Sequence, residues 1–195
     1  MRLFTIMFII LILLSGCSNK PSLELISSSV EIRDDRSGRV GINSGEKTGE
    51  FIEPISLSYD FILKNTGKKT LGKGEKLNKQ TFKFDDGIKV LIEPHEKLVK
   101  VSKEVMDFNL YSDEERQESE LGLGFGERSI AVLEPNQEGE YSFDFVLGAS
   151  EENPEMAIAP SPEQLNKLKR SAMDATLIIF IEDEEIARFD LSKSN

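Results

Sequence analysis

The sequence predicts a mainly β protein, a β-sandwich with about two short helices in its connections. Several stretches alternate between apolar and polar residues with a period of two, which is typical of strands buried on one face. Turn residues separate these stretches at irregular spacing, and only two stretches have the spacing of an amphipathic helix. This combination favours two antiparallel sheets packed face to face.

The first two expected strands cover residues 23–33 and the segment ISLSYDFIL at residues 55–63. In the first strand the apolar parity slips between Leu25 and Val30, which is consistent with a β-bulge. The second strand predicts one apolar face and one polar face; the apolar face holds Ile55, Leu57, Tyr59, Phe61 and Leu63, and the polar face holds Ser56, Ser58 and Asp60. The Asn-Thr-Gly sequence at 65–67 predicts a turn after this strand.

Later strands follow the same alternation. They are expected in IKVLI (88–92), RSIAVLEP (128–135), YSFDFVL (141–147), TLIIFI (176–181) and IARFDL (186–191). The last two segments predict a hairpin across the acidic turn that separates them. About seven or eight strands are expected in total.

The best helix signal is SPEQLNKLKRSA at residues 161–172. Ser161 is a natural N-cap, Pro162 fits the first helical position, and Gln164 completes the spacing of a capping box. A second helix is expected over residues 95–108, although a strand at KLVKV is an alternative. The intervening segments 34–50, 111–126 and 148–162 are expected to be loops, and no internal repeat divides residues 23–195 into more than one domain.

The N-terminal segment resembles the signal peptide and lipobox of bacterial lipoproteins. A short apolar run from Leu3 to Leu14 follows Arg2, and it ends in Leu14-Ser15-Gly16-Cys17, which holds the only cysteine of the chain. This run is shorter than the roughly 20 residues that a spanning helix needs. The resemblance implies that residues 1–16 are removed and that Cys17 receives the lipid, palmitate among its acyl chains.

The lipobox resemblance sets the expected location and domain boundaries. Residues 17–22 are expected to form a lipidated tether on the extracytoplasmic face of the cell membrane, and residues 23–195 a single domain. The tether spans at most about 17 Å, so the domain is expected to lie close to the membrane. A lone cysteine leaves no internal disulfide, so the fold depends on its core.

The segment YDFILKNTGKKTLG resembles immunoglobulin-like domains in surface lipoproteins of Gram-positive bacteria, where a strand of the form F-x-L-x-N-T-G leads into a turn. The resemblance implies an immunoglobulin-like β-sandwich architecture. The Cys…Trp…Cys signature of antibody-type domains is absent, because the chain has no Trp.

The charge distribution excludes some partners. The formal net charge of −11 becomes −12 when the segment with Arg2 is removed, and such acidity disfavours nucleic acid. Residues 64–83 are an exception, with seven lysines against the single acid Glu75. These residues are candidates for contact with an anionic membrane or polymer, or else they form a solvated hairpin loop; they are Lys64, Lys68, Lys69, Lys73, Lys76, Lys79 and Lys83.

No catalytic residue, metal ligand or cofactor is predicted. His95 is the only histidine, too few for an ordinary zinc site or a serine-histidine pair, and it is expected at a helix start or on the surface. The acidic clusters at 113–115, 151–152 and 182–185 lack the spacing of an EF-hand and are expected to be solvated. The glycines of GLGFGERS lack dinucleotide-binding spacing and predict a loop.

Two kinds of function remain. The first is a non-enzymatic, membrane-anchored binding module whose partner is an envelope protein or an anionic polymer. The second is an accessory or inhibitory subunit of an envelope enzyme, protease or transporter. A hydrolase that uses paired carboxylates is a third reading, and it requires two acids facing one pocket.

Overall fold

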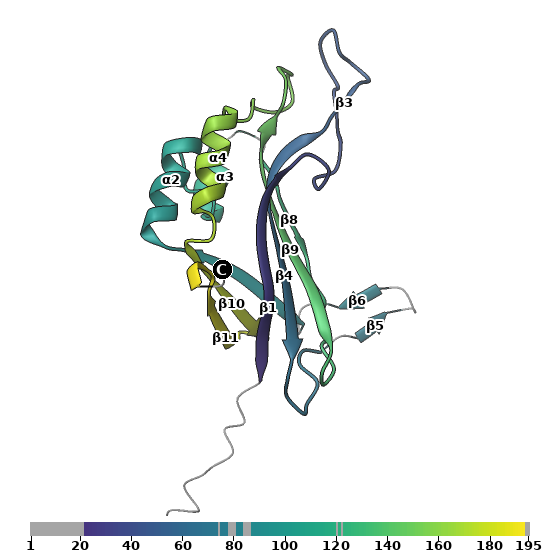
Figure 1. The fold of residues 1–195 in the computed structure, drawn as a ribbon. Helices are drawn as coiled ribbons and strands as arrows, with labels where there is room; N and C mark the ends of the chain where they lie inside the picture. Colours follow the sequence, from purple (N-terminus) through teal and green to yellow (C-terminus); the bar gives the residue numbers. More distant parts are fainter. Residues whose placement is uncertain are drawn as a thin grey trace, which may run out of the picture.

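The computed structural model describes residues 22–73, 75–77, 81–83, 87–119, 121 and 123–193. The chain is mainly β, and its architecture is sandwich-like, as the alternation predicts. The larger sheet has four antiparallel strands in the order β1-β4-β9-β8 (Figure 1). They are β1 Leu23–Arg33, β4 Pro54–Asn65, β9 Glu138–Ala149 and β8 Phe125–Arg128.

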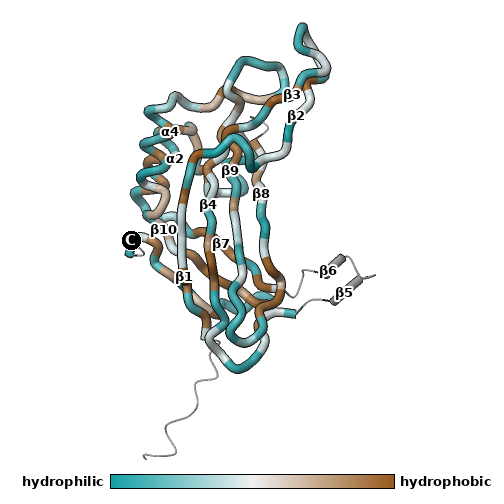
Figure 2. The backbone as a smooth tube through the Cα atoms, turned by 45° about the vertical axis from the view of Figure 1, so that its right-hand side comes forward, coloured by the Kyte–Doolittle hydropathy of each residue, from teal (hydrophilic) through white to brown (hydrophobic). Residues whose placement is uncertain are grey.

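The smaller sheet covers part of the inner face of the larger one (Figure 1). Its three antiparallel strands lie in the order β11-β10-β7, and they are β7 Ile88–Pro94, β10 Ala175–Ile181 and β11 Glu184–Asp190. Helices α2 (Glu96–Met106) and α4 (Pro162–Ser171) contact each other and cover the rest of that face. The apolar residues concentrate between these layers (Figure 2).

The apolar face of β4 forms the centre of the core, as predicted. Leu57, Tyr59, Phe61 and Leu63 are at most 1 % exposed, and they pack with buried residues of β7, β9, β10 and both helices. Tyr59 and Tyr111 share a hydroxyl-hydroxyl hydrogen bond of 2.5 Å, and the Tyr59 hydroxyl donates to the Ala172 carbonyl oxygen at 2.9 Å. Burial raises the pKa of both tyrosines, so this pair stays neutral.

Two local predictions are confirmed. The β-bulge lies in β1 between Leu25 and Ser27, within the stretch where the parity slips. Ser161 caps α4 in a capping box with Gln164, as its spacing predicts. The segment expected to be helical over residues 95–108 forms a helix at Glu96–Met106 rather than a strand, with His95 at its N-cap position.

The prediction of a strand at residues 128–135 is wrong. The edge strand β8 lies earlier, at Phe125–Arg128, and Leu133 makes only an isolated bridge to Leu71. Ala131 and Leu133 are buried beneath the segment that follows β4, where the Ala131 carbonyl oxygen would lie 2.1 Å from a Cβ at Gly72. Apolar residues that cover the end of a core give the same alternation as a strand, which explains the error.

Three segments expected to be loops contain small elements. Residues 34–50 include strand β2 (Val40–Gly41), which pairs with β3 (Phe51–Ile52). We call this projecting pair and its loop the arm; it lies at the end of the molecule opposite the start of β1 (Figure 1). A six-residue helix, α3, covers Asp113–Glu118, and a short hairpin pairs β5 (Glu75–Leu77) with β6 (Thr81–Lys83). A 3-10 turn at Leu191–Lys193 follows β11.

Candidate binding cleft

The outer face of the larger sheet carries a polar strip at its centre. In the register of β4 and β9, Ser58 pairs with Asp144 and Asp60 pairs with Ser142. Directly paired residues of antiparallel strands project from the same face, with Cβ atoms roughly 5 Å apart. Ser29 of β1 and Arg128 of β8 extend the strip to the outer strands, so hydroxyl, carboxylate and guanidinium groups line one face.

The segment after β1 folds back across this strip. The Arg36 guanidinium donates to the Asp60 carboxylate, and the Ser37 and Ser56 hydroxyls form a hydrogen bond of 2.5 Å. The Arg36 side chain is only 17 % exposed. Ser56 and Ser58, which the sequence places on the polar face of their strand, are consequently buried at 0 and 1 % exposure.

Arg36 lies between two cavities, which together we call the Arg36 cleft. The larger cavity has a volume of about 490 Å³, and its polar wall includes Ser27, Ser29, Asp60, Arg128 and Glu140. The smaller cavity, about 310 Å³, is lined by apolar residues that include Val40, Val146 and Met156 and by the polar residues Arg36, Ser37 and Asp144.

Three buried polar atoms, one of Arg36 and two of the strands that it covers, have no hydrogen-bond partner within the described part of the chain. They are Ser58 Oγ, Asp144 Oδ1 and Arg36 Nε. An unsatisfied buried polar group costs about 1–3 kcal/mol, and a charged group costs more. Proteins keep such groups at positions where a ligand or ordered water completes them. Arg36 and Asp144 line the cavities and Ser58 does not, so the cleft offers one donor and one acceptor to a bound molecule.

Two carboxylates from adjacent strands, Asp60 and Glu140, line the larger cavity. The carboxylate-pair reading requires two acids in one pocket, and in the register of β4 and β9 these two lie opposite different residues, Ser142 and Ile62. Asp60 is engaged by Arg36 in an ion pair, which favours a binding role for it over a general-acid role.

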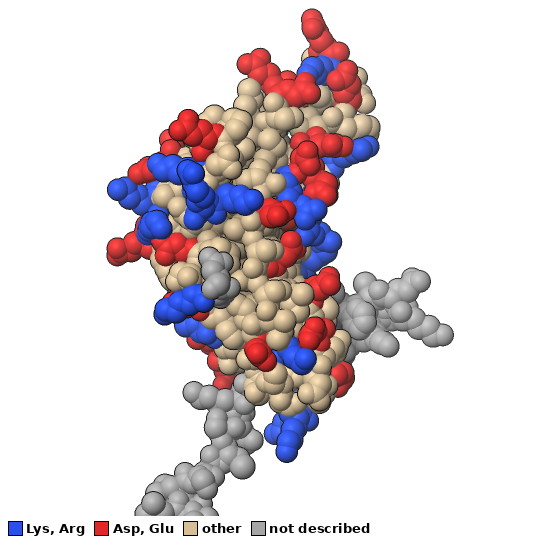
Figure 3. All heavy atoms as spheres, in the orientation of Figure 1, with Lys and Arg blue, Asp and Glu red and all other residues tan. Residues whose placement is uncertain are grey.

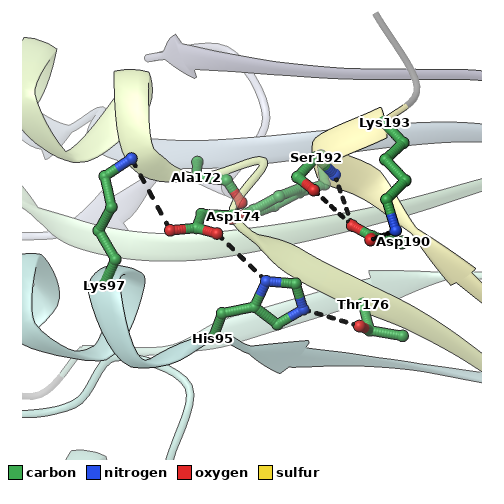
Figure 4. Close-up of polar contacts among 9 residues, drawn as sticks. His95, Lys97, Ala172, Asp174, Thr176, Asp190, Ser192 and Lys193 are labelled. Atoms are coloured by element: carbon green, nitrogen blue, oxygen red, sulfur yellow. Dashed lines mark hydrogen bonds and ion pairs between the residues drawn. The ribbon is translucent and has the colours of Figure 1, made fainter.

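His95 lies in a separate polar cluster on the smaller sheet (Figure 4). Its Nδ1 lies 3.1 Å from Asp174 Oδ1, and its Nε2 lies 2.9 Å from Thr176 Oγ1. A hydroxyl, an imidazole and a carboxylate in this order resemble a nucleophile relay. Thr176 is, however, only 7 % exposed, and neither cavity of the Arg36 cleft includes these residues.

The His95 cluster also joins two parts of the backbone. The His95 amide donates to the Asp174 carbonyl oxygen at 3.0 Å, and Lys97 lies 3.8 Å from the Asp174 carboxylate. These contacts tie the start of α2 to the segment between α4 and β10. We therefore assign the cluster a structural role, in line with the helix-start position that the sequence predicts for His95.

The seven lysines proposed from the sequence to contact an anionic surface differ in whether they are paired with a carboxylate. Lys64 pairs with Glu138 at 3.0 Å and Lys73 with Glu182 at 2.5 Å, whereas Lys68 and Lys69 are exposed and have no carboxylate within ion-pairing distance among the described residues. Lys76 and Lys83 lie in the β5–β6 hairpin, whose side chains are outside the description. Lys79 and the lipidation residue Cys17 lie outside the described residues.

Sequence reasoning missed the Arg36 cleft. Arg36 lies in a segment expected to be a loop, and Asp144 lies on the polar side of a predicted strand, where a solvated residue is the ordinary expectation. A usable signal was present in the pairing of two strands that both carry Ser and Asp on the face opposite the core. Such a face is more polar than solvation alone requires.

No family model, curated protein or solved structure matches this chain. Within the described part, no group of three or more His, Cys, Asp or Glu residues is placed to hold a metal ion. The described helices include none that is long and apolar enough to cross a membrane. Fold and site thus define a class, a sandwich-like β domain with a polar cleft on the outer face of its larger sheet.

Proposed function

We propose that this protein is a lipid-anchored, extracytoplasmic binding module of the cell envelope, which holds a polar ligand in the Arg36 cleft. The anchor is the lipid on Cys17, as the lipobox resemblance implies. The mainly β, sandwich-like fold agrees with the immunoglobulin-like domain that the segment YDFILKNTGKKTLG resembles. The observation that carries the binding role is the set of buried polar atoms, in Arg36 and the strands that it covers, that have no hydrogen-bond partner among the described residues.

The position of the lysines supports the anchored arrangement. Ser22 and Thr66 are joined by a backbone hydrogen bond of 2.9 Å and a side-chain hydrogen bond of 2.8 Å. The start of the domain and the loop with Lys68 and Lys69 therefore lie at the same end. A tether of about 17 Å holds that end next to the headgroups, where basic residues are favourable.

The anchor is tested by replacing Cys17 with Ala. We expect the variant to be released from the membrane fraction, because the domain then has no acyl chain to insert. The measurement is the share of protein in washed membranes, with Ser18→Ala as the matched control that keeps the cysteine. Equal membrane association of Cys17→Ala and the unsubstituted protein would contradict the lipoprotein assignment.

The cleft is tested by cross-linking in intact cells. A photoreactive residue in place of Ser29, which is exposed beside Asp60, is expected to form an adduct with an envelope component. The same residue in place of Asn166, on the exposed face of α4, serves as the control. Equal yields at the two positions would count against binding in the cleft.

One observation favours the accessory or inhibitory alternative. Phe51 is 67 % exposed on the arm, at the end of the domain far from β1's first residue. An exposed aromatic residue on a projecting hairpin is typical of protein contacts. Inhibition of an envelope protease that is lost in Phe51→Ser and kept in Arg36→Ala would favour this alternative over ligand binding in the cleft.

A further inference from the structure

The smaller cavity of the Arg36 cleft contains a carboxylate whose charge is not balanced nearby. Asp144 is 6 % exposed, its Oδ1 is fully buried, and no hydrogen bond or ion pair reaches its side chain from the described residues. Arg36 lines the same cavity, but its guanidinium is paired with Asp60, and neither its Nε nor Asp144 Oδ1 has a hydrogen-bond partner among the described residues, so the two carboxylates share one guanidinium. A buried carboxylate that stays ionised requires a compensating partner, because its charge has been removed from water.

The lining of this cavity combines apolar and polar side chains. Val40, Val146 and Met156 provide apolar surface, and Pro54 continues it. The Asp144 carboxylate and the Ser37 hydroxyl provide acceptors. A cavity lined by apolar side chains and an unpaired carboxylate is complementary to an ammonium group on an aliphatic stem, since the stem packs while the charged head is hydrogen-bonded.

Gly126 keeps space open beside the carboxylate. It lies opposite Asp144 in the register of β8 and β9, and a Cβ built on it would lie 3.7 Å from Asp144 Cβ and 4.0 Å from Asp144 Oδ2. Any larger side chain at this position would therefore occupy the space next to the carboxylate. The absence of a side chain here leaves room for a ligand head group.

We propose that Asp144 and the cavity beside it bind a primary ammonium group on an aliphatic stem, such as a lysine side chain. The proposal rests on the proposed binding function and adds the chemistry of the ligand. The ammonium replaces the missing partner of Asp144 Oδ1, while Val40, Val146 and Met156 contact the methylene groups. The ammonium belongs either to a side chain of a partner protein segment or to a small free amine.

The test is an NMR titration of the full mature chain carrying Cys17→Ser. The probes are acetyl-Ala-Lys-Ala-amide, the same peptide with norleucine in place of lysine, and n-butylamine. We expect the lysine peptide to shift the amide resonances of Gly126 and Ser37. We also expect it to bind at least about tenfold more tightly than the norleucine peptide, because only lysine can form a charge-assisted hydrogen bond with Asp144. Tighter binding of the peptide than of n-butylamine indicates a protein segment, and equal binding indicates a small amine.

Two variants separate binding from structure. Asp144→Asn is expected to abolish the preference for lysine while the melting temperature stays equal or rises, because an unpaired buried charge is removed. Gly126→Val is expected to weaken binding of both peptides by occluding the cavity. Glu140→Gln, in the other cavity, is the control and is expected to keep the preference.

Several results would overturn the proposal. These are equal affinity for the two peptides, a lysine preference that survives Asp144→Asn, or a clearly lower melting temperature in Asp144→Asn, which would make the carboxylate structural. If cross-linking at Ser29 succeeds while the lysine preference is absent, the ligand class is wrong and the binding function stands. If both fail, the Arg36 cleft is not a binding site.

Discussion

At the residue scale, the hydroxyl group of Tyr59 links the core of the larger sheet to the end of helix α4. The Tyr59 hydroxyl donates to the Ala172 carbonyl oxygen, so the Tyr111 hydroxyl is the donor in the bond between the two tyrosines. The Ala172 carbonyl lies at the end of α4, where the last carbonyls of a helix need partners. Tyr59 therefore contributes both apolar contact and the capping of a helix end.

This reading predicts different effects for two matched substitutions. Tyr59→Phe removes the donor and leaves the buried Ala172 carbonyl unsatisfied, which is expected to lower the free energy of unfolding by about 1–3 kcal/mol. Tyr111→Phe leaves the Tyr59–Ala172 bond in place and is expected to cost less, about 1 kcal/mol. Urea denaturation of both variants provides the comparison, and equal losses would contradict the assignment of the donors.

At the element scale, α4 is specified by its own first turn. The Ser161 side chain accepts from the Gln164 amide, and the Gln164 side chain accepts from the Ser161 amide at 3.0 Å. These bonds satisfy donors that an α-helix leaves free at its start. Leu165 and Leu168 then bury the helix against the core, so the local signal and the packing agree.

Removing the cap tests how much of α4 depends on it. Ser161→Ala is expected to reduce the free energy of unfolding by about 1 kcal/mol. Asn166→Ala, on the exposed face of the same helix, is the control and is expected to have no cost, because Ala has the higher helix propensity. A Ser161→Ala variant as stable as the unsubstituted protein would show that packing alone holds the helix.

At the scale of the whole molecule, the charges are unevenly placed. Acidic side chains predominate around the arm, whereas a basic group projects beyond the acidic ones at the end where β1 begins (Figure 3). The exposed Lys68 and Lys69 lie in the loop at that end. Screening limits each charge to a range of about 8 Å at physiological salt, so a nearby membrane interacts mainly with the basic end. The net charge of the chain therefore does not prevent contact with anionic lipid at that end.

The whole-molecule prediction concerns membrane contact without the lipid. The mature Cys17→Ser protein is expected to co-sediment with phosphatidylglycerol vesicles and not with phosphatidylcholine vesicles, and added salt is expected to weaken binding. Lys68→Glu with Lys69→Glu is expected to reduce the affinity about tenfold or more, because each basic residue contributes about 1 kcal/mol. The same charge change at Lys100 and Lys167, on α2 and α4, is the control. If the control pair reduces binding as much, the contact depends on total charge and not on this end.

The elements that the sequence predicts well are those whose signals are local. Ser161 and Gln164 are three residues apart, and the alternation from Leu57 to Leu63 reports one buried face without reference to any other strand. The error at residues 128–135 came from burial that alternates without strand pairing, because Ala131 and Leu133 cover a core edge. The small arm was missed because each of its strands has only two residues, whereas a hairpin was one of the two expectations for residues 64–83.

The sequence by itself determined the mainly β class, the principal strands and the two longer helices, since these depend on short-range patterns; lipid attachment at Cys17 stays a prediction from such a pattern. Only the tertiary structure decided the Arg36 cleft. Arg36 meets Asp60 across 24 residues of chain, and Asp144 joins them from a strand much later in the sequence. The burial of a polar face depends on which loop folds over it, and that is set by long-range packing, which no local pattern encodes.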